Sequence, residues 1–148
     1  MRFTIPVALI VIAVLFQHDT YSQKSFLIEG KIALYNAEEN SSYIKFRTYG
    51  LLGRHRDTSI KINKNGSFKV VLSQAFNGDI ALMYRNGFVV LYMTQSEKMI
   101  ITIDDRKYIP ENIFDIAALT FHGKTAETTR HINNFLRKKE RYKFNFEV

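Results

Sequence analysis

The sequence contains no cysteine and no tryptophan among its 148 residues, and only two prolines. Without cysteine, the chain cannot form a disulfide, hold zinc through thiolates, use a thiol nucleophile or carry a CxxC redox pair. A lipid anchor on an N-terminal cysteine is excluded as well. The missing cysteine indicates no compartment, because an exported protein can also lack it.

Long apolar runs are equally scarce. The densest one extends from Ile5 to Phe16 and follows a single positive charge at Arg2. A membrane-spanning helix needs about 20 apolar residues, so this run is short for an anchor and fits the apolar core of a signal peptide. A buried core helix is disfavoured because His18 and Asp19 follow the run directly.

A cleavage site follows the apolar run. Thr20 and Ser22 occupy its −3 and −1 positions, so that cleavage falls before Gln23. We therefore predict that residues 1–22 are a signal peptide and that residues 23–148 form one domain in the periplasm or cell envelope. An uncleaved N-terminal anchor is the main alternative.

The net charge is +7 at pH 7. Arg2 and Asp19 cancel within the leader, so the mature domain keeps this charge. A basic surface suits nucleic acid, an anionic surface or plain solubility. Because an exported protein rarely meets nucleic acid, we expect no nucleic-acid partner. We also expect no integral membrane span after signal cleavage.

Apolar residues alternate with polar ones in several segments, which is typical of half-buried β strands. Ile44 and Phe46 are expected to point inward. Asn65-Gly66 and Asn86-Gly87 each lie between two alternating runs and predict two hairpins. The expected strands lie within residues 25–36, 41–50, 58–72, 79–94, 99–104 and 114–123. The predicted fold is mostly β, an antiparallel β-sandwich or barrel-like domain.

The hydrophobic period changes after Gly123. Ile132, Phe135 and Leu136 have the spacing of an apolar helical stripe. Thr125 is a suitable N-cap residue. One C-terminal α-helix is therefore predicted at about 125–142.

The last residues alternate again. Tyr142, Phe144, Phe146 and Val148 are apolar and separated by polar residues. Such a segment either packs on the domain's own sheet or adds a strand to the sheet of a partner. We favour the first interpretation.

Four groups of residues resemble functional motifs, and each has a simpler interpretation. His122 and His131 lack the converging partners of a zinc site. Asp104 and Asp105 are neighbours that a strand would point to opposite faces, so a turn is favoured over a carboxylate pair. Segment 50–57 is too poor in glycine to cradle a phosphate.

The fourth group is the basic helix. It does not interleave aromatic side chains with its charges, as RNA readers do. No residue is therefore assigned a catalytic, cofactor-binding or metal-binding role, no cofactor is expected, and the chain is predicted not to be an enzyme.

Two motifs carry a resemblance to a known family. Asp57, Thr58, Gly66 and Phe68 form the first, and Gly123, Lys124, Ala126, Asn134 and Leu136 form the second. Their order over residues 25–140 resembles the N-terminal domain, of unknown function, of exported TlpA/ResA-type thiol-disulfide oxidoreductases. The catalytic thioredoxin-like half of that family, with its CxxC pair, has no counterpart in these residues.

The resemblance implies an envelope location but no oxidoreductase activity. We expect a non-catalytic exported domain that acts in protein interaction or positioning. Two alternatives stay open. One is an accessory subunit that docks on a separate envelope thioredoxin-like enzyme, and the other is a β-sandwich that binds a small ligand.

Overall fold

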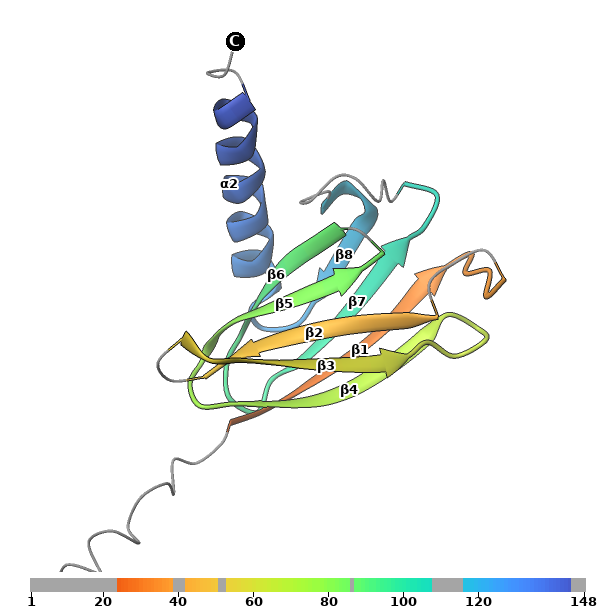
Figure 1. The fold of residues 1–148 in the computed structure, drawn as a ribbon, viewed down its shortest axis with the longest axis horizontal. Helices are drawn as coiled ribbons and strands as arrows, with labels where there is room; N and C mark the ends of the chain where they lie inside the picture. The colour runs from red at the N-terminus through yellow and green to blue at the C-terminus, as the bar shows by residue number, and fades with distance from the viewer. Residues whose placement is uncertain (1–23, 39–41, 51–52, 86, 108–115, 145–148) are drawn as a thin grey trace, which may run out of the picture.

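The computed structural model describes residues 24–38, 42–50, 53–85, 87–107 and 116–144. Within these residues, eight strands form two four-stranded sheets (Figure 1). The strands are β1 (Lys24–Ala33), β2 (Tyr43–Tyr49), β3 (His55–Lys61), β4 (Ser67–Gln74), β5 (Gly78–Tyr84), β6 (Gly87–Met93), β7 (Lys98–Asp104) and β8 (Leu119–His122). The helical elements are the short 3-10 helix η2 (Ile116–Ala118) and α2 (Ala126–Phe144).

The strand orders are β4-β1-β7-β8 in one sheet and β3-β2-β5-β6 in the other. All paired strands are antiparallel except β1 and β7, which run parallel. The sheets are not closed into a barrel. The prediction of a mostly β, antiparallel-rich sandwich with a C-terminal helix is therefore confirmed, and the parallel pair is an addition to it.

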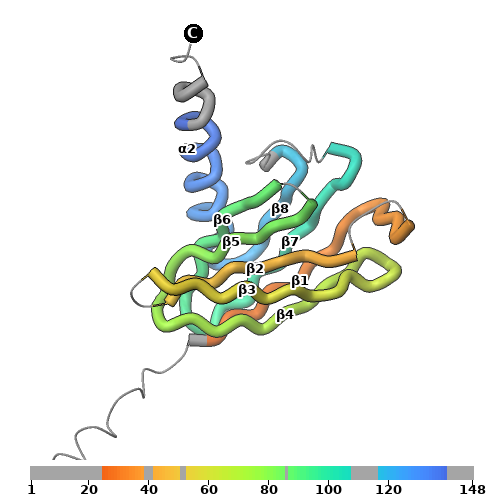
Figure 2. The backbone as a smooth tube through the Cα atoms, in the orientation of Figure 1, coloured from red at the N-terminus to blue at the C-terminus, as the bar shows by residue number. Residues whose placement is uncertain are grey.

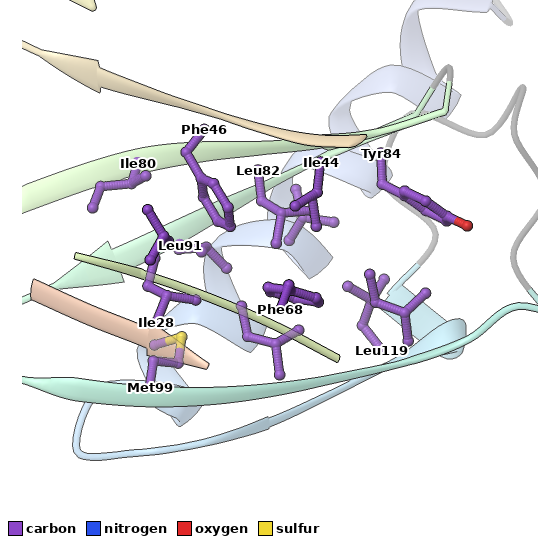
Figure 3. Close-up of a cluster of buried hydrophobic side chains, with 14 of the residues drawn as sticks. Ile28, Ile44, Phe46, Phe68, Ile80, Leu82, Tyr84, Leu91, Met99 and Leu119 are labelled. Atoms are coloured by element: carbon purple, nitrogen blue, oxygen red, sulfur yellow. The ribbon is translucent and has the colours of Figure 1, made fainter. Parts of the chain in front are cut away.

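Side chains of both sheets meet in one hydrophobic core, as Figure 3 shows. Ile44 and Phe46 point inward, as predicted, and both are fully buried. Phe46 on β2 packs against Phe68 on β4, with ring centroids 6.3 Å apart, and so joins the two sheets. The Phe68 ring lies over Gly30, where a Cβ atom would come within 2.1 Å of it. Alternation along most of the strands thus supplies one buried face to each sheet.

The prediction of a hairpin at Asn65-Gly66 is wrong. A tight turn is present, since the Gly66 amide donates to the Asn63 carbonyl over 2.8 Å. However, β3 pairs with β2 and β4 pairs with β1, so this turn leads from one sheet to the other. The residues Asn65 and Gly66 determine the local turn of the backbone. Which strands then pair depends on burying the apolar face of each strand in the core.

The second hairpin is confirmed. β5 and β6 pair antiparallel from Gly78 opposite Met93 to Tyr84 opposite Gly87. The register places the turn one residue earlier than predicted, with Arg85 at a positive φ of 52°. Asn86 lies outside the described residues.

The helix is also confirmed, although its buried face differs from the prediction. Phe135 of the predicted apolar stripe is 65% exposed, whereas Thr129 and Asn133 are fully buried. The predicted alternating tail is wrong for Tyr142 and Phe144, because both belong to α2. Its last positions lie outside the described residues, as does the predicted signal peptide.

Helix α2 begins against the sandwich and then leaves it. It contacts β6 and β8, the last strands of the two sheets, whereas β3 and β4 approach each other at the opposite side. Figures 1 and 2 show its later turns extending beyond the strands. Among the described helices, none is both long and apolar enough to cross a bilayer.

Candidate functional site

A hollow of about 450 Å³ lies on the face of the β3-β2-β5-β6 sheet that points away from the core. We call it the outer-face hollow. Tyrosine and phenylalanine rings form much of its wall, and Asp79 is its one charged side chain. The lining residues are Tyr49, Phe76, Gly78, Asp79, Ala81, Phe88, Val90 and Tyr92.

The strand register explains the shape of the outer-face hollow. On β5 and β6, Asp79 lies opposite Tyr92 and Ala81 lies opposite Val90. Successive side chains alternate between faces, so these four point outward while Ile80 points into the core. The short Ala81 side chain lies among larger neighbours, and the surface is therefore lowest there.

A buried amide holds the rim of the hollow. Gln74, at the end of β4, is only 3% exposed. Its side-chain oxygen accepts from the Tyr49 backbone amide over 3.3 Å, and its amide nitrogen donates to the Phe76 carbonyl over 3.0 Å. These bonds fix the end of β2 to the turn before β5. Tyr49 and Phe76 are thereby held at one site, although they are far apart in the chain.

Asp79 gives the hollow its electrostatic character. The residue as a whole is exposed, yet desolvation by the surrounding walls raises the pKa of its carboxyl group. No described residue forms an ion pair or a hydrogen bond with this carboxylate. Partial burial without a compensating partner disfavours the charged form. The hollow therefore presents an uncompensated negative charge to whatever enters it.

A neighbouring cation is already engaged. Arg47 on β2 lies opposite Ala81, on the same outer face. Its guanidinium donates two hydrogen bonds to Asp57 on β3, over 2.7 and 2.9 Å. This bidentate geometry lowers the pKa of Asp57 and directs the guanidinium toward β3. Because Arg47 is paired with Asp57, it does not neutralise the Asp79 carboxylate.

A second polar arrangement joins α2 to the edge of β6. Thr129 accepts from the Tyr92 backbone amide over 3.0 Å, and Asn133 accepts from the Val90 amide over 2.9 Å. The Asn133 amide nitrogen also donates to the Val90 carbonyl over 2.6 Å. With Thr125, whose hydroxyl contacts the Tyr92 carbonyl, these residues repeat every four positions on one side of the helix. We call Thr125, Thr129 and Asn133 the β6 clamp.

Glu97 anchors the start of the helix. It is only 7% exposed, and it accepts from the backbone amides and hydroxyls of both Thr94 and Thr125, over 2.7 to 2.9 Å. Burial opposes its ionisation most strongly, but the hydrogen bonds from Thr125 and Thr94 together hold the pKa of Glu97 below its ordinary value. The carboxylate thus ties the β6–β7 turn to the helix N-terminus.

The histidines considered as metal ligands are not brought together. His122 is exposed at the end of β8, whereas His131 is exposed on α2 and lies 3.8 Å from Glu127. Across the described parts of the chain, no group of three or more side chains could hold a metal ion.

The two neighbouring aspartates lie where a strand ends in a turn, as predicted, with Asp104 the last residue of β7 and Asp105 the first of the turn. Asp104 accepts from the Arg106 amide and pairs with Arg106 and Lys107. Asp105 instead pairs with Arg85 over 3.3 Å, at the end of the β5–β6 hairpin. The two carboxylates therefore serve different contacts and do not form a pair.

Segment 50–57 is only partly a connector. Gly50 and Arg54 close a turn through a backbone hydrogen bond. Strand β3 then begins at His55, earlier than predicted, and Asp57 within it holds Arg47. The segment provides an ion pair on the outer face and not a phosphate-binding loop.

Four of the residues that carry the family resemblance have structural roles. Gly66 forms the turn between sheets, and Phe68 is buried in the core. Gly123 turns the chain from β8 into α2, and a Cβ atom there would lie 2.8 Å from the Lys98 carbonyl oxygen. Ala126 packs against the core.

Sequence reasoning found neither the outer-face hollow nor the β6 clamp. The hollow collects residues from β2, β5, β6 and one turn, which no local pattern connects. The clamp did leave a signal, since Thr125, Thr129 and Asn133 recur every four residues. That signal is polar, whereas helix faces are usually sought by their apolar residues.

In comparison with known proteins, no family model, no curated protein and no solved structure matches the chain.

Proposed function

We propose that the chain is a non-catalytic exported domain that acts through protein contact. The observation that carries this proposal is the arrangement of α2. Its first turns are fixed to the sandwich by the β6 clamp. Farther along, Phe135 is 65% exposed beside His131 and Lys138. A fixed helix that presents an aromatic side chain to solvent suits docking, because aromatic anchors contribute much of the energy of interfaces.

The family resemblance supports the same function. A module placed before a thioredoxin-like domain would position that domain or its partner. In the alternative proposal, the chain docks in trans on a separate envelope thioredoxin-like enzyme. Both the positioning role and docking in trans require an exported location. Cell fractionation and mass spectrometry of the mature N-terminus would test this location.

Photo-crosslinking in intact cell envelopes tests the docking role. A photoreactive amino acid is placed at Phe135, and a matched control is placed at Val71, which is 64% exposed on the other sheet. We expect a discrete crosslinked product from position 135 alone. The absence of that product, or the same product from both positions, would contradict docking through α2. A thioredoxin-like enzyme in the product would favour the alternative in trans.

A second candidate function is small-ligand binding. It is favoured by the outer-face hollow, because binding sites for small molecules are usually concave and mostly apolar with a few polar groups. The described core residues pack between the sheets, so the ligand would bind on the outside of the sandwich.

A further inference from the structure

We propose that the outer-face hollow binds a small organic ammonium cation, with the apolar body of the ligand against the aromatic wall and its charge at Asp79. This inference rests on the second candidate function, small-ligand binding. It adds the chemical class of the ligand.

The size and walls of the hollow define the body of the ligand. A volume of about 450 Å³ lies within the usual range for small-molecule sites. Tyr49, Phe76 and Tyr92 offer aromatic surfaces, and Ala81 leaves the depth for an apolar group. Because Gln74 holds Tyr49 and Phe76 through hydrogen bonds, the site is largely formed before a ligand arrives. Little ordering would then oppose binding.

The charge of the ligand follows from Asp79. A cation would supply the partner that this carboxylate lacks among the described residues. Aromatic faces also attract cations, through their negative electrostatic potential. An anionic ligand would instead be repelled by Asp79, and a neutral one would bury the carboxylate further without a partner. Arg47 does not supply the missing charge, because Asp57 holds it.

Three probes that share a phenyl ring test the inference. The full chain is titrated with 2-phenylethylammonium, 2-phenylethanol and 3-phenylpropionate, and binding is followed by chemical-shift changes of the backbone amides. We expect the cation to bind most tightly. Its shifts should be confined to Gly78, Ala81, Val90 and their neighbours.

Two variants test whether the Asp79 carboxylate and the space above Ala81 take part in binding, and a third variant is the control. Asp79→Asn should weaken binding of 2-phenylethylammonium about tenfold, since it removes one charge-assisted contact. Ala81→Leu should fill the hollow and abolish binding of both the cation and the alcohol. Glu127→Gln also removes one carboxylate, but from the exposed face of α2, and should leave binding unchanged.

The outcomes distinguish a failure of the cation assignment from a failure of small-ligand binding itself. If the alcohol binds as tightly as the cation, or if Asp79→Asn has no effect, the hollow binds small molecules but the cation assignment is overturned. If all three probes fail to shift the amides around the hollow, small-ligand binding there is overturned as well. Shifts confined to another part of the chain would have the same meaning.

Discussion

Gly66 lies where the backbone leaves no room for a side chain. Its φ is +80°, and a Cβ atom would come within 2.4 Å of the Ile32 carbonyl oxygen. Gly53 is a matched control, with a φ of +72° and open space around it. We expect Gly53→Ala to cost about 1 kcal/mol, the usual cost of a left-handed alanine. Gly66→Ala should cost about 1–3 kcal/mol more, because backbone must move.

Denaturant unfolding of the two glycine variants provides the measurement. Equal losses in both would mean that the contact between β1 and the Gly66 turn is looser than the structure shows.

Glu97 should make stability depend on pH in the acid range. Its pKa in the folded protein is lowered from 4.5. Because the folded state favours the ionised form, the resulting stabilisation is fully present above the unfolded-state pKa. It is lost as the pH falls from there through the lower folded-state pKa. Glu97→Gln removes this titration and places an amide N–H against the donors of Thr94 or Thr125.

The free energy of unfolding of wild type and Glu97→Gln is compared from neutral pH downward. The wild type should be more stable at neutral pH, and the difference should shrink below about pH 4.5. Glu29, Asp57 and Asp104 also have lowered pKa values. They titrate in both proteins and therefore cancel in the comparison. A difference that stays constant with pH would show that Glu97 acts only through packing.

At the scale of elements, α2 behaves toward β6 as a neighbouring strand would. The Asn133 amide bonds both the amide and the carbonyl of Val90, as a peptide group of a paired strand does. Replacing it by alanine leaves the partly buried amide and carbonyl of Val90 without these partners. We expect Asn133→Ala to cost about 2 kcal/mol or more. The control Asn134→Ala, one position along, should cost less than about 0.5 kcal/mol. Similar losses in urea unfolding would argue against the β6 clamp.

Removing the helix should expose the edges that it covers. A chain shortened after Gly123 lacks the entire β6 clamp and leaves β6 and β8 uncovered. Uncovered edges pair with other chains. We expect this variant to form oligomers in size-exclusion chromatography with light scattering. A chain shortened after Lys139 keeps the clamp and is the control. A monomer from the first truncation would show that β6 does not need the helix.

The elements differ in how far the sequence predicts them. Alternation around Ile44 and Phe46 predicts a buried face because half-buried strands require it. Asn65-Gly66 predicts a turn but not the sheet to which the next strand belongs. The same backbone turn can join two strands of one sheet or lead from one sheet to the other. The hydrophobic period predicts the position of helix α2 but places its buried face at Phe135. The buried face is instead at Thr129, because tertiary hydrogen bonds to β6 override the hydrophobic period. The outer-face hollow depends on register between distant strands, which no local signal carries.

At the scale of the whole molecule, the topology predicts slow folding. The first strand pairs in parallel with β7, from Leu27 opposite Lys98 to Ala33 opposite Asp104. The 70 residues between Leu27 and Lys98 must be looped out before these contacts form, and such long-range pairing slows folding. We expect refolding in milliseconds to seconds, as is typical of β sandwiches. Stopped-flow measurements test this, and refolding in microseconds would contradict the strand order.

Strand β1 is the first of the described strands along the chain, but it lies inside its sheet, between β4 and β7. A chain that lacks β1 would have a gap in this sheet, with unpaired backbone groups on the facing edges of β4 and β7. We expect a separate peptide of residues 24–34 to supply the missing strand, so that two fragments assemble into one folded domain. The same arrangement provides a reporter of export, because only fragments that reach one compartment would complement each other.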